Sequence, residues 1–241
     1  NIIPGGSITN DESLYLSFTI SEPTSDFTSD DVLVSGGSIS SFFGSGSIYT
    51  AILTPSSDGP VIVDIADGTF TDATGNGNSD FGPFNWTYDG TLPTIINVSL
   101  ASNNSSIAVT FSEAVYSTSS GSGSLETSDF TFSISGGTGA LSSSTPTSIS
   151  ANGLTYTLGI GLSGTPNGSE TLTVTPAENA IYDVGGNAAN TTQTNNTVTL
   201  NNMSNLLRVD DDAVVAGDTA WVTLSMDNYD EGVSLQVDLD Y

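Results

Sequence analysis

Two turns with the same spacing carry the side chains best suited to bind a metal ion. Residues 70–78 read FTDATGNGN and residues 181–190 read IYDVGGNAAN, so each contains Asp-x-x-Gly-Asn after an apolar residue. The Asp and Asn side chains of the two Asp-x-x-Gly-Asn motifs are Asp72, Asn76, Asp183 and Asn187, and each offers an oxygen that could bind a cation. Because carboxylate and amide oxygens are the ligands that Ca²⁺ prefers, one hypothesis is that these turns bind calcium.

The same residues also fit a tight turn that needs no ligand. An Asp carboxylate can accept nearby backbone N–H groups, and a Gly three residues later supplies a positive φ. The motif lacks the ligand spacing of an EF-hand loop and the glycine-rich repeat of calcium β-rolls. The turn hypothesis and the calcium hypothesis are both open at the level of sequence.

A further acidic candidate follows the first of these turns. The segment YDGTLPT, residues 88–94, is short and acidic, and Pro93 restricts its backbone. Asp89 in this segment is a candidate calcium ligand. An ion held there would stiffen the connection between two domains.

The residue types that are absent exclude most catalytic chemistry. The chain of 241 residues has 27 acidic side chains, no His, no Cys and a single cation, Arg208. It can therefore form no Ser-His-Asp triad, no disulfide and no lysine Schiff base. Two carboxylates could cleave a glycoside, but the sequence does not indicate a cleft for them. We predict that the chain is not an enzyme and that calcium is its one candidate cofactor.

The net charge limits the classes of partner. A formal charge of −26 repels the phosphate backbone of nucleic acid and anionic membranes. No run of about 18 apolar residues is present, so no membrane insertion is expected. Trp86 and Trp221 are expected to pack in a core, and a glycan-binding face that includes Trp86 and Tyr88 is the alternative.

Internal similarity shows that one pattern occurs twice. FTISEP at residues 18–23 matches VTFSEA at 109–114, and YTAILTP at 49–55 matches YTLGIGL at 156–162. Short alternating or apolar runs between Gly, Pro, Ser and Asp predict strands. The predicted strands are residues 14–20, 32–34, 49–53, 61–65, 84–88, 95–100, 107–111, 130–134, 156–160, 172–174 and 198–200. Such a density of short strands is typical of an antiparallel β-sandwich.

The first copy, from SEPTSDF at residue 21 to GTLPT at residue 94, resembles the bacterial Ig-like repeats of surface adhesins and other secreted proteins. The second copy, from INVSL to VGGNAA, resembles a sister Ig-like family of surface-layer and cell-wall-associated proteins. The last residues are similar to the opening strands of cohesin-like modules, with expected strands at 219–225 and 233–241. The fold class is therefore predicted as all-β, with tandem Ig-like antiparallel β-sandwiches. The predicted domains are 1–90, 91–202 and 203–241, the last being a partial β module.

The resemblance implies a structural spacer segment of an extracellular or cell-surface protein: an adhesin, a surface-layer component or a fibre. Expected partners are further copies of the chain or neighbouring domains of the same protein, with a glycan as the other option. The alternative function is a carbohydrate-binding or docking module of a secreted hydrolase.

The first copy has no counterpart of LPTIINVSL, residues 92–100, which opens the second copy. One interpretation is that the sequence is a fragment. The other is strand complementation, in which the tail of one subunit supplies the missing strand to the next and builds a head-to-tail fibre.

Overall fold

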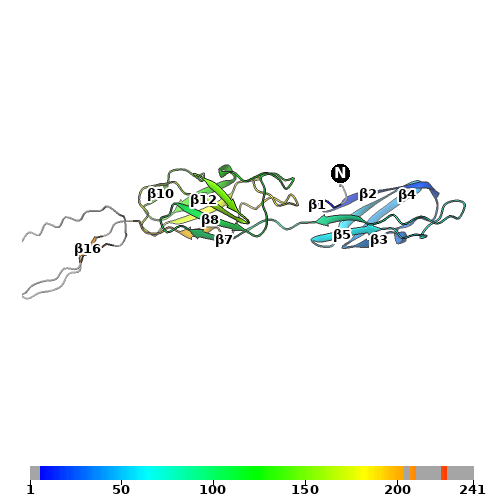
Figure 1. Ribbon diagram of the computed structural model, residues 1–241, viewed down its shortest axis with the longest axis horizontal. Coiled ribbons are helices and arrows are strands. Elements are labelled where there is room, and N and C mark those ends of the chain that lie inside the picture. Colours follow the sequence, from blue (N-terminus) through cyan, green and yellow to red (C-terminus); the bar gives the residue numbers. More distant parts are fainter. Residues whose placement is uncertain (1–5, 204–206, 210–223, 227–241) are drawn as a thin grey trace, which may run out of the picture. The chain divides into compact units, whose positions relative to one another are not determined.

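The computed structural model describes residues 6–203, 207–209 and 224–226 (Figure 1). Within these ranges the ordered elements are β-strands and two short 3₁₀ turns, Ser29–Asp31 and Thr127–Asp129, and no α-helix is present. No helix in this part of the chain is therefore long and apolar enough to cross a bilayer. The predicted all-β fold class is confirmed.

The chain divides into two compact units, each assembled from three segments. Unit 1 takes residues 1–94, 111–129 and 176–193, and unit 2 takes residues 95–110, 130–175 and 194–241. Two loops from the second repeat thus belong to unit 1. The predicted domain limits at 90 and 202 do not follow this division and stay a prediction.

Unit 1 has two sheets that face each other. The four strands of the first sheet, in their spatial order, are β1 (Ile8–Thr9), β6 (Phe84–Tyr88), β5 (Gly59–Asp64) and β3 (Leu33–Ser35). The second sheet has two antiparallel strands, β2 (Leu14–Thr24) and β4 (Gly37–Pro55). Figure 1 shows β2 and β4 on one side of this unit and β5 and β3 on the other.

The core of unit 1 lies between these sheets because alternate residues of each strand point inward. Leu53, Val61 and Val63 are buried there, and Trp86 is only 1% exposed. The Trp86 indole Nε1 donates to the Thr9 hydroxyl at 3.1 Å, which satisfies its one polar group. The expected core role of Trp86 is therefore confirmed.

Unit 2 is also built from sheets. Its larger sheet has the order β11 (Ile149–Asn152), β12 (Thr155–Gly159), β8 (Ser106–Phe111) and β7 (Ile95–Leu100). A three-stranded sheet has the order β15 (Thr197–Thr199), β14 (Thr171–Pro176) and β9 (Phe130–Ser135). A small pair joins β10 (Ala140–Leu141) to β13 (Leu162–Ser163). A separate antiparallel pair joins β16 (Leu207–Val209) to β17 (Leu224–Met226).

The predicted strands agree closely with those observed where the apolar pattern is strong. Residues 84–88 and 95–100 are strands with the predicted bounds. The first half of β4 and the two-residue strands were not predicted, because serine-rich and very short runs give little periodicity. Of the expected strand 219–225, residues 224–225 lie in β17. The expected strand 233–241 and Trp221 lie outside the described residues.

Candidate metal centre

The first Asp-x-x-Gly-Asn turn is closed by hydrogen bonds to its own carboxylate. Asp72 accepts the backbone N–H of Thr74 at 2.7 Å and that of Asn76 at 2.9 Å. The Asn76 side-chain amide donates to the same carboxylate at 2.7 Å, and Gly75 has a φ of 89°. The side-chain and backbone bonds from Asn76 hold the pKa of Asp72 well below its usual range.

The second turn repeats this arrangement in a buried setting. Asp183 has no exposed surface, and its two carboxylate oxygens accept the backbone N–H of Asn187 at 2.8 Å and the Asn187 side-chain amide at 2.9 Å. Gly186 takes a φ of 94°. Both motifs therefore have the hydrogen bonds that the turn hypothesis expects. These bonds do not test the calcium hypothesis, which stays a prediction.

The two turns differ in the acidic residues that surround them. Asp89, Glu113 and Asp183 each present a carboxylate oxygen, and these three oxygens lie within 4.8 Å of one another. We name these three residues the acidic triad. Ca²⁺ binds oxygen at roughly 2.3–2.6 Å, so ligands on opposite sides of one ion are about 5 Å apart. The acidic triad therefore has a spacing that suits a shared divalent cation.

Three separate segments of unit 1 bring the triad together. Asp89 directly follows β6, Glu113 follows the end of β8, and Asp183 belongs to the second turn. Asp183 is fully buried, and the other two side chains are half-buried. None of the described side chains carries a positive charge, since Arg208 is the single cation of the sequence and its side chain is not among them.

The electrostatics of the triad follow from burial and mutual repulsion. Burial raises the pKa of Asp89, and the charges of Asp183 and Asp58 raise it further. Burial likewise raises the pKa of Glu113, with added repulsion from Asp183 and Asp89. A divalent cation would relieve both effects.

Asn187 connects the triad to the surrounding backbone. Its amide Nδ2 donates to the Asp89 carbonyl oxygen at 2.8 Å, and its Oδ1 accepts from the Asn10 amide at 3.1 Å. The Asn10 backbone N–H donates in turn to the Gly185 carbonyl at 3.0 Å. A Cβ at Gly185 would lie 2.9 Å from the Asp89 Cβ, so a larger residue there would displace Asp89.

Only some of the ligands predicted from the sequence lie close together in the structure. The structure brings Asp89, Asp183 and Asn187 together, whereas Asp72 and Asn76 form a separate turn outside the triad. Sequence reasoning missed Glu113. The matching elements SEP and SEA place Glu22 and Glu113 at equivalent positions, and this repetition is the signal in the sequence that could have found Glu113.

Glu170 in unit 2 is a second carboxylate that sequence reasoning did not single out. It is fully buried and accepts backbone N–H groups from Thr138, Gly139, Asn167 and Gly168 at distances of 2.7–3.1 Å. Burial alone would raise the pKa of Glu170, but these hydrogen bonds outweigh it and lower the pKa to about 2. Because backbone N–H groups already donate to both carboxylate oxygens, we infer that Glu170 has a structural role.

Comparison with known proteins bears on the first repeat. Residues 3–86 match a family model described as a bacterial Ig-like domain, which covers about a third of the chain. Such domains are typically non-catalytic and often occur on extracellular proteins. The comparisons with curated proteins and with solved structures gave no significant match. The resemblance of the second repeat to a sister family, and of the tail to cohesin-like modules, stays a prediction.

Proposed function

We propose that this chain is a non-enzymatic spacer segment of an extracellular adhesin, surface-layer protein or fibre, and that its acidic triad binds calcium. The spacer role is supported by the Ig-like match over residues 3–86 and by the all-β architecture. The calcium site is supported by one observation: three carboxylates converge within 4.8 Å with no cationic side chain described beside them.

Calcium would link the three chain segments that carry the acidic triad. Without an ion, the three carboxylates repel one another in a site from which water is partly excluded. With an ion, Asp89, Glu113 and Asp183 are attracted to one point, which ties together segments that are far apart in the sequence. Calcium takes roughly six to eight oxygen ligands, so backbone carbonyls and water would complete its shell. The result is a stiffer segment, as a spacer requires.

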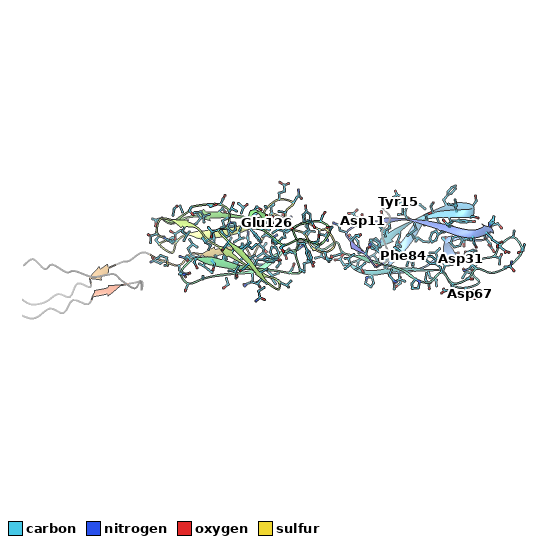
Figure 2. The ribbon with its side chains drawn as sticks, turned by 45° about the horizontal axis from the view of Figure 1, so that its top comes forward. Asp11, Tyr15, Asp31, Asp67, Phe84 and Glu126 are labelled. Carbon is cyan, nitrogen blue, oxygen red and sulfur yellow. The ribbon has the colours of Figure 1, made fainter. Side chains whose placement is uncertain are left out.

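Calorimetric titration of the full chain with calcium tests the site. We expect saturable binding that Glu113→Gln weakens by about tenfold or more, because it removes one of three charged ligands. The matched control is Glu126→Gln, which makes the same chemical change at an exposed residue outside the triad (labelled in Figure 2). Equal binding by both variants, or no saturable binding by the unmodified chain, would refute the site.

The finer parts of this proposal concern partners. Copies of the same chain and neighbouring domains of the same protein are the proposed contacts, with head-to-tail assembly by strand complementation as the mode. A carbohydrate-binding or docking module of a hydrolase is less well supported, because the buried Trp86 offers no face to a sugar ring.

A further inference from the structure

The outer edge of β2 in unit 1 has no described strand beside it, whereas the equivalent edge in unit 2 is covered. The repeats align Phe18 of β2 with Val109 of β8, and these residues pair with Tyr49 and Tyr156, which are also equivalent. In unit 2, β8 lies between β12 and β7. In unit 1, β2 pairs with β4 alone. The position that β7 occupies therefore has no counterpart among the described residues of unit 1.

The absence of that neighbour leaves apolar side chains accessible. On β8 the inward residues Ile107, Val109 and Phe111 have no exposed surface. Their equivalents on β2, in the same order, are Leu16, Phe18 and Ile20, and each of these is only partly buried. Since the two strands have the same inward pattern, the difference is explained by the strand that covers β8.

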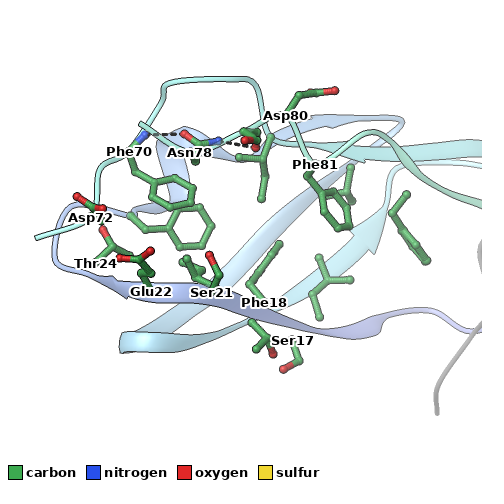
Figure 3. Close-up of a pocket in the computed structure, with 18 of the residues that line it drawn as sticks. Ser17, Phe18, Ser21, Glu22, Thr24, Phe70, Asp72, Asn78, Asp80 and Phe81 are labelled. Carbon is green, nitrogen blue, oxygen red and sulfur yellow. Dashed lines mark hydrogen bonds between the residues drawn. The ribbon is translucent and has the colours of Figure 1, made fainter. Parts of the chain in front are cut away.

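A groove of about 760 Å³ follows this open edge. One wall consists of nine consecutive residues of β2, 14–22, and the other includes residues 76–81. Phe81 on that second wall is 63% exposed, although it faces the groove. In Figure 3, Phe18 and Phe81 point into the space between β2 and the opposite loop, and Ser17 points away from it.

The first Asp-x-x-Gly-Asn turn closes one end of the groove. Asp72 and Asn76 both line it, and Asp72 forms a β-bridge with Thr24 at the end of β2. The open edge of β2 is therefore bounded at this end and runs back toward Leu14. Its length matches a strand of about nine residues.

We propose that this groove is a strand-acceptor site for residues 233–241 of a second copy of this chain. The proposal deepens the spacer function and rests on it for its biological meaning. The segment reads VSLQVDLDY, in which five apolar residues alternate with four polar ones over nine positions. In a strand, this alternation places the apolar side chains on one face. The backbone of such a strand can pair with the open edge of β2 while its apolar face fills the groove.

Donation between copies would produce head-to-tail assembly, because the donor and the acceptor are different surfaces. Repulsion between acidic side chains of the donor and the acceptor should make this assembly depend on ionic strength. The donor carries Asp238 and Asp240 on its polar face, and Glu22 lines the acceptor groove. These like charges repel at low ionic strength, so salt should promote assembly.

Sedimentation velocity of the full chain, from micromolar to millimolar concentration in high salt, tests the proposal. We expect species at multiples of the monomer mass that become more abundant with concentration. The double substitution Leu235→Asp and Val237→Asp should weaken association by on the order of a hundredfold, because two apolar side chains no longer fill the groove. Gln236→Asp adds a charge on the opposite face and should have a much smaller effect.

Two further measurements identify the contact. Excess synthetic peptide of the sequence VSLQVDLDY should shorten the assemblies by occupying the acceptor, and a peptide with both apolar-to-Asp changes should not. Hydrogen exchange should show that amides of residues 14–22 and 233–241 gain protection together on assembly.

Three outcomes would overturn the proposal. The first is a monomer at all concentrations, and the second is assembly that the double substitution leaves unchanged. The third is protection of both segments without an increase in mass, which would mean that the tail folds onto its own chain. Failure of the calcium site gives a different result. In that case Glu113→Gln leaves calcium binding unchanged, whatever the state of assembly.

Discussion

The side-chain amide of Asn187 donates to the backbone carbonyl of Asp89, 98 positions earlier in the sequence, at 2.8 Å. The same amide nitrogen donates to the Asp183 carboxylate at 2.9 Å. One Asn side chain thus links the Asp183 carboxylate to the backbone of Asp89. The second Asp-x-x-Gly-Asn motif is both a turn and the support of the candidate metal centre, whereas the first motif is a turn at the end of a groove.

Substituting Asn187 should weaken calcium binding without removing a charge. In Asn187→Ala, the Asp183 carboxylate and the Asp89 carbonyl oxygen each lose the Asn187 amide as a hydrogen-bond donor, so the triad is less firmly held at its native spacing. Leaving buried polar groups without partners costs roughly 1–3 kcal/mol, so the melting temperature should also fall. Asn76→Ala is the matched control, because it alters the equivalent turn outside the triad. Calorimetry with the two variants should show weaker calcium binding for Asn187→Ala only.

Neutralising Glu113 should have opposite effects on stability in EDTA and in calcium. Because burial and nearby charges raise the pKa of Glu113, the native state holds its proton more tightly than the unfolded chain does. Its contribution to stability is therefore present at low pH and is lost as pH rises through the raised pKa. At neutral pH in EDTA, Glu113→Gln should be more stable than the unmodified chain by on the order of 1 kcal/mol, which is typical for repulsion at this range in a partly solvated site.

In saturating calcium the order should reverse, since the unmodified chain gains a ligand that Glu113→Gln has lost. Urea unfolding curves from pH 4 upward, with and without calcium, measure both differences. If Glu113→Gln and Glu126→Gln behaved alike under every condition, the repulsion within the triad would be negligible.

Gly185→Ala should disturb the triad through packing alone. The new methyl group would lie 2.9 Å from the Asp89 Cβ, so Asp89 or the turn must shift. Overpacking of this kind costs roughly 1–3 kcal/mol, and calcium affinity should fall with it. Gly77→Ala is the control, because its nearest contact would be 3.3 Å and its φ is not positive. Equal melting temperatures for the two variants would contradict the close approach of residue 185 to Asp89.

Glu170→Gln should destabilise unit 2 in a pH-dependent way. The substitution removes a charged acceptor of several backbone N–H groups, which we expect to cost roughly 2–4 kcal/mol at neutral pH. Because hydrogen bonding lowers the pKa of Glu170 to about 2, its stabilising effect is complete above its ordinary pKa of 4.5. The effect is lost as pH falls from there toward 2. Guanidinium unfolding at several pH values should show the gap between the two proteins closing in acid, with Glu126→Gln showing no such gap.

The fold was more accessible from the sequence than the site. Strands such as 84–88 and 95–100 are set by local alternation of apolar side chains, which a single sequence displays. The meeting of Asp89 with Asp183 depends on loops that return to unit 1 from the second repeat, and no local pattern encodes that return. Glu170 shows the same limit, because backbone N–H groups have no signature in the sequence.

Only the open edge of β2, and not the opposite wall of the groove, could be predicted from the sequence. Comparison of the two repeats predicted that the strand equivalent to β7 would not be found beside β2, and among the described residues β2 pairs only with β4. The sequence could not show that residues 76–81 form an opposite wall, or that Phe81 stays exposed beside it. Those features depend on the path of a loop with little regular structure.

Thermal unfolding of the full chain in EDTA and in excess calcium, each at low and high NaCl, tests whether calcium braces the native protein. We expect calcium, but not NaCl, to raise the melting temperature by several degrees, because an ion well above its dissociation constant stabilises the native state that binds it. Glu113→Gln should abolish most of that rise. An equal rise with NaCl alone would mean that the acidic residues are only a mutually repelling surface, and it would contradict the calcium-braced spacer.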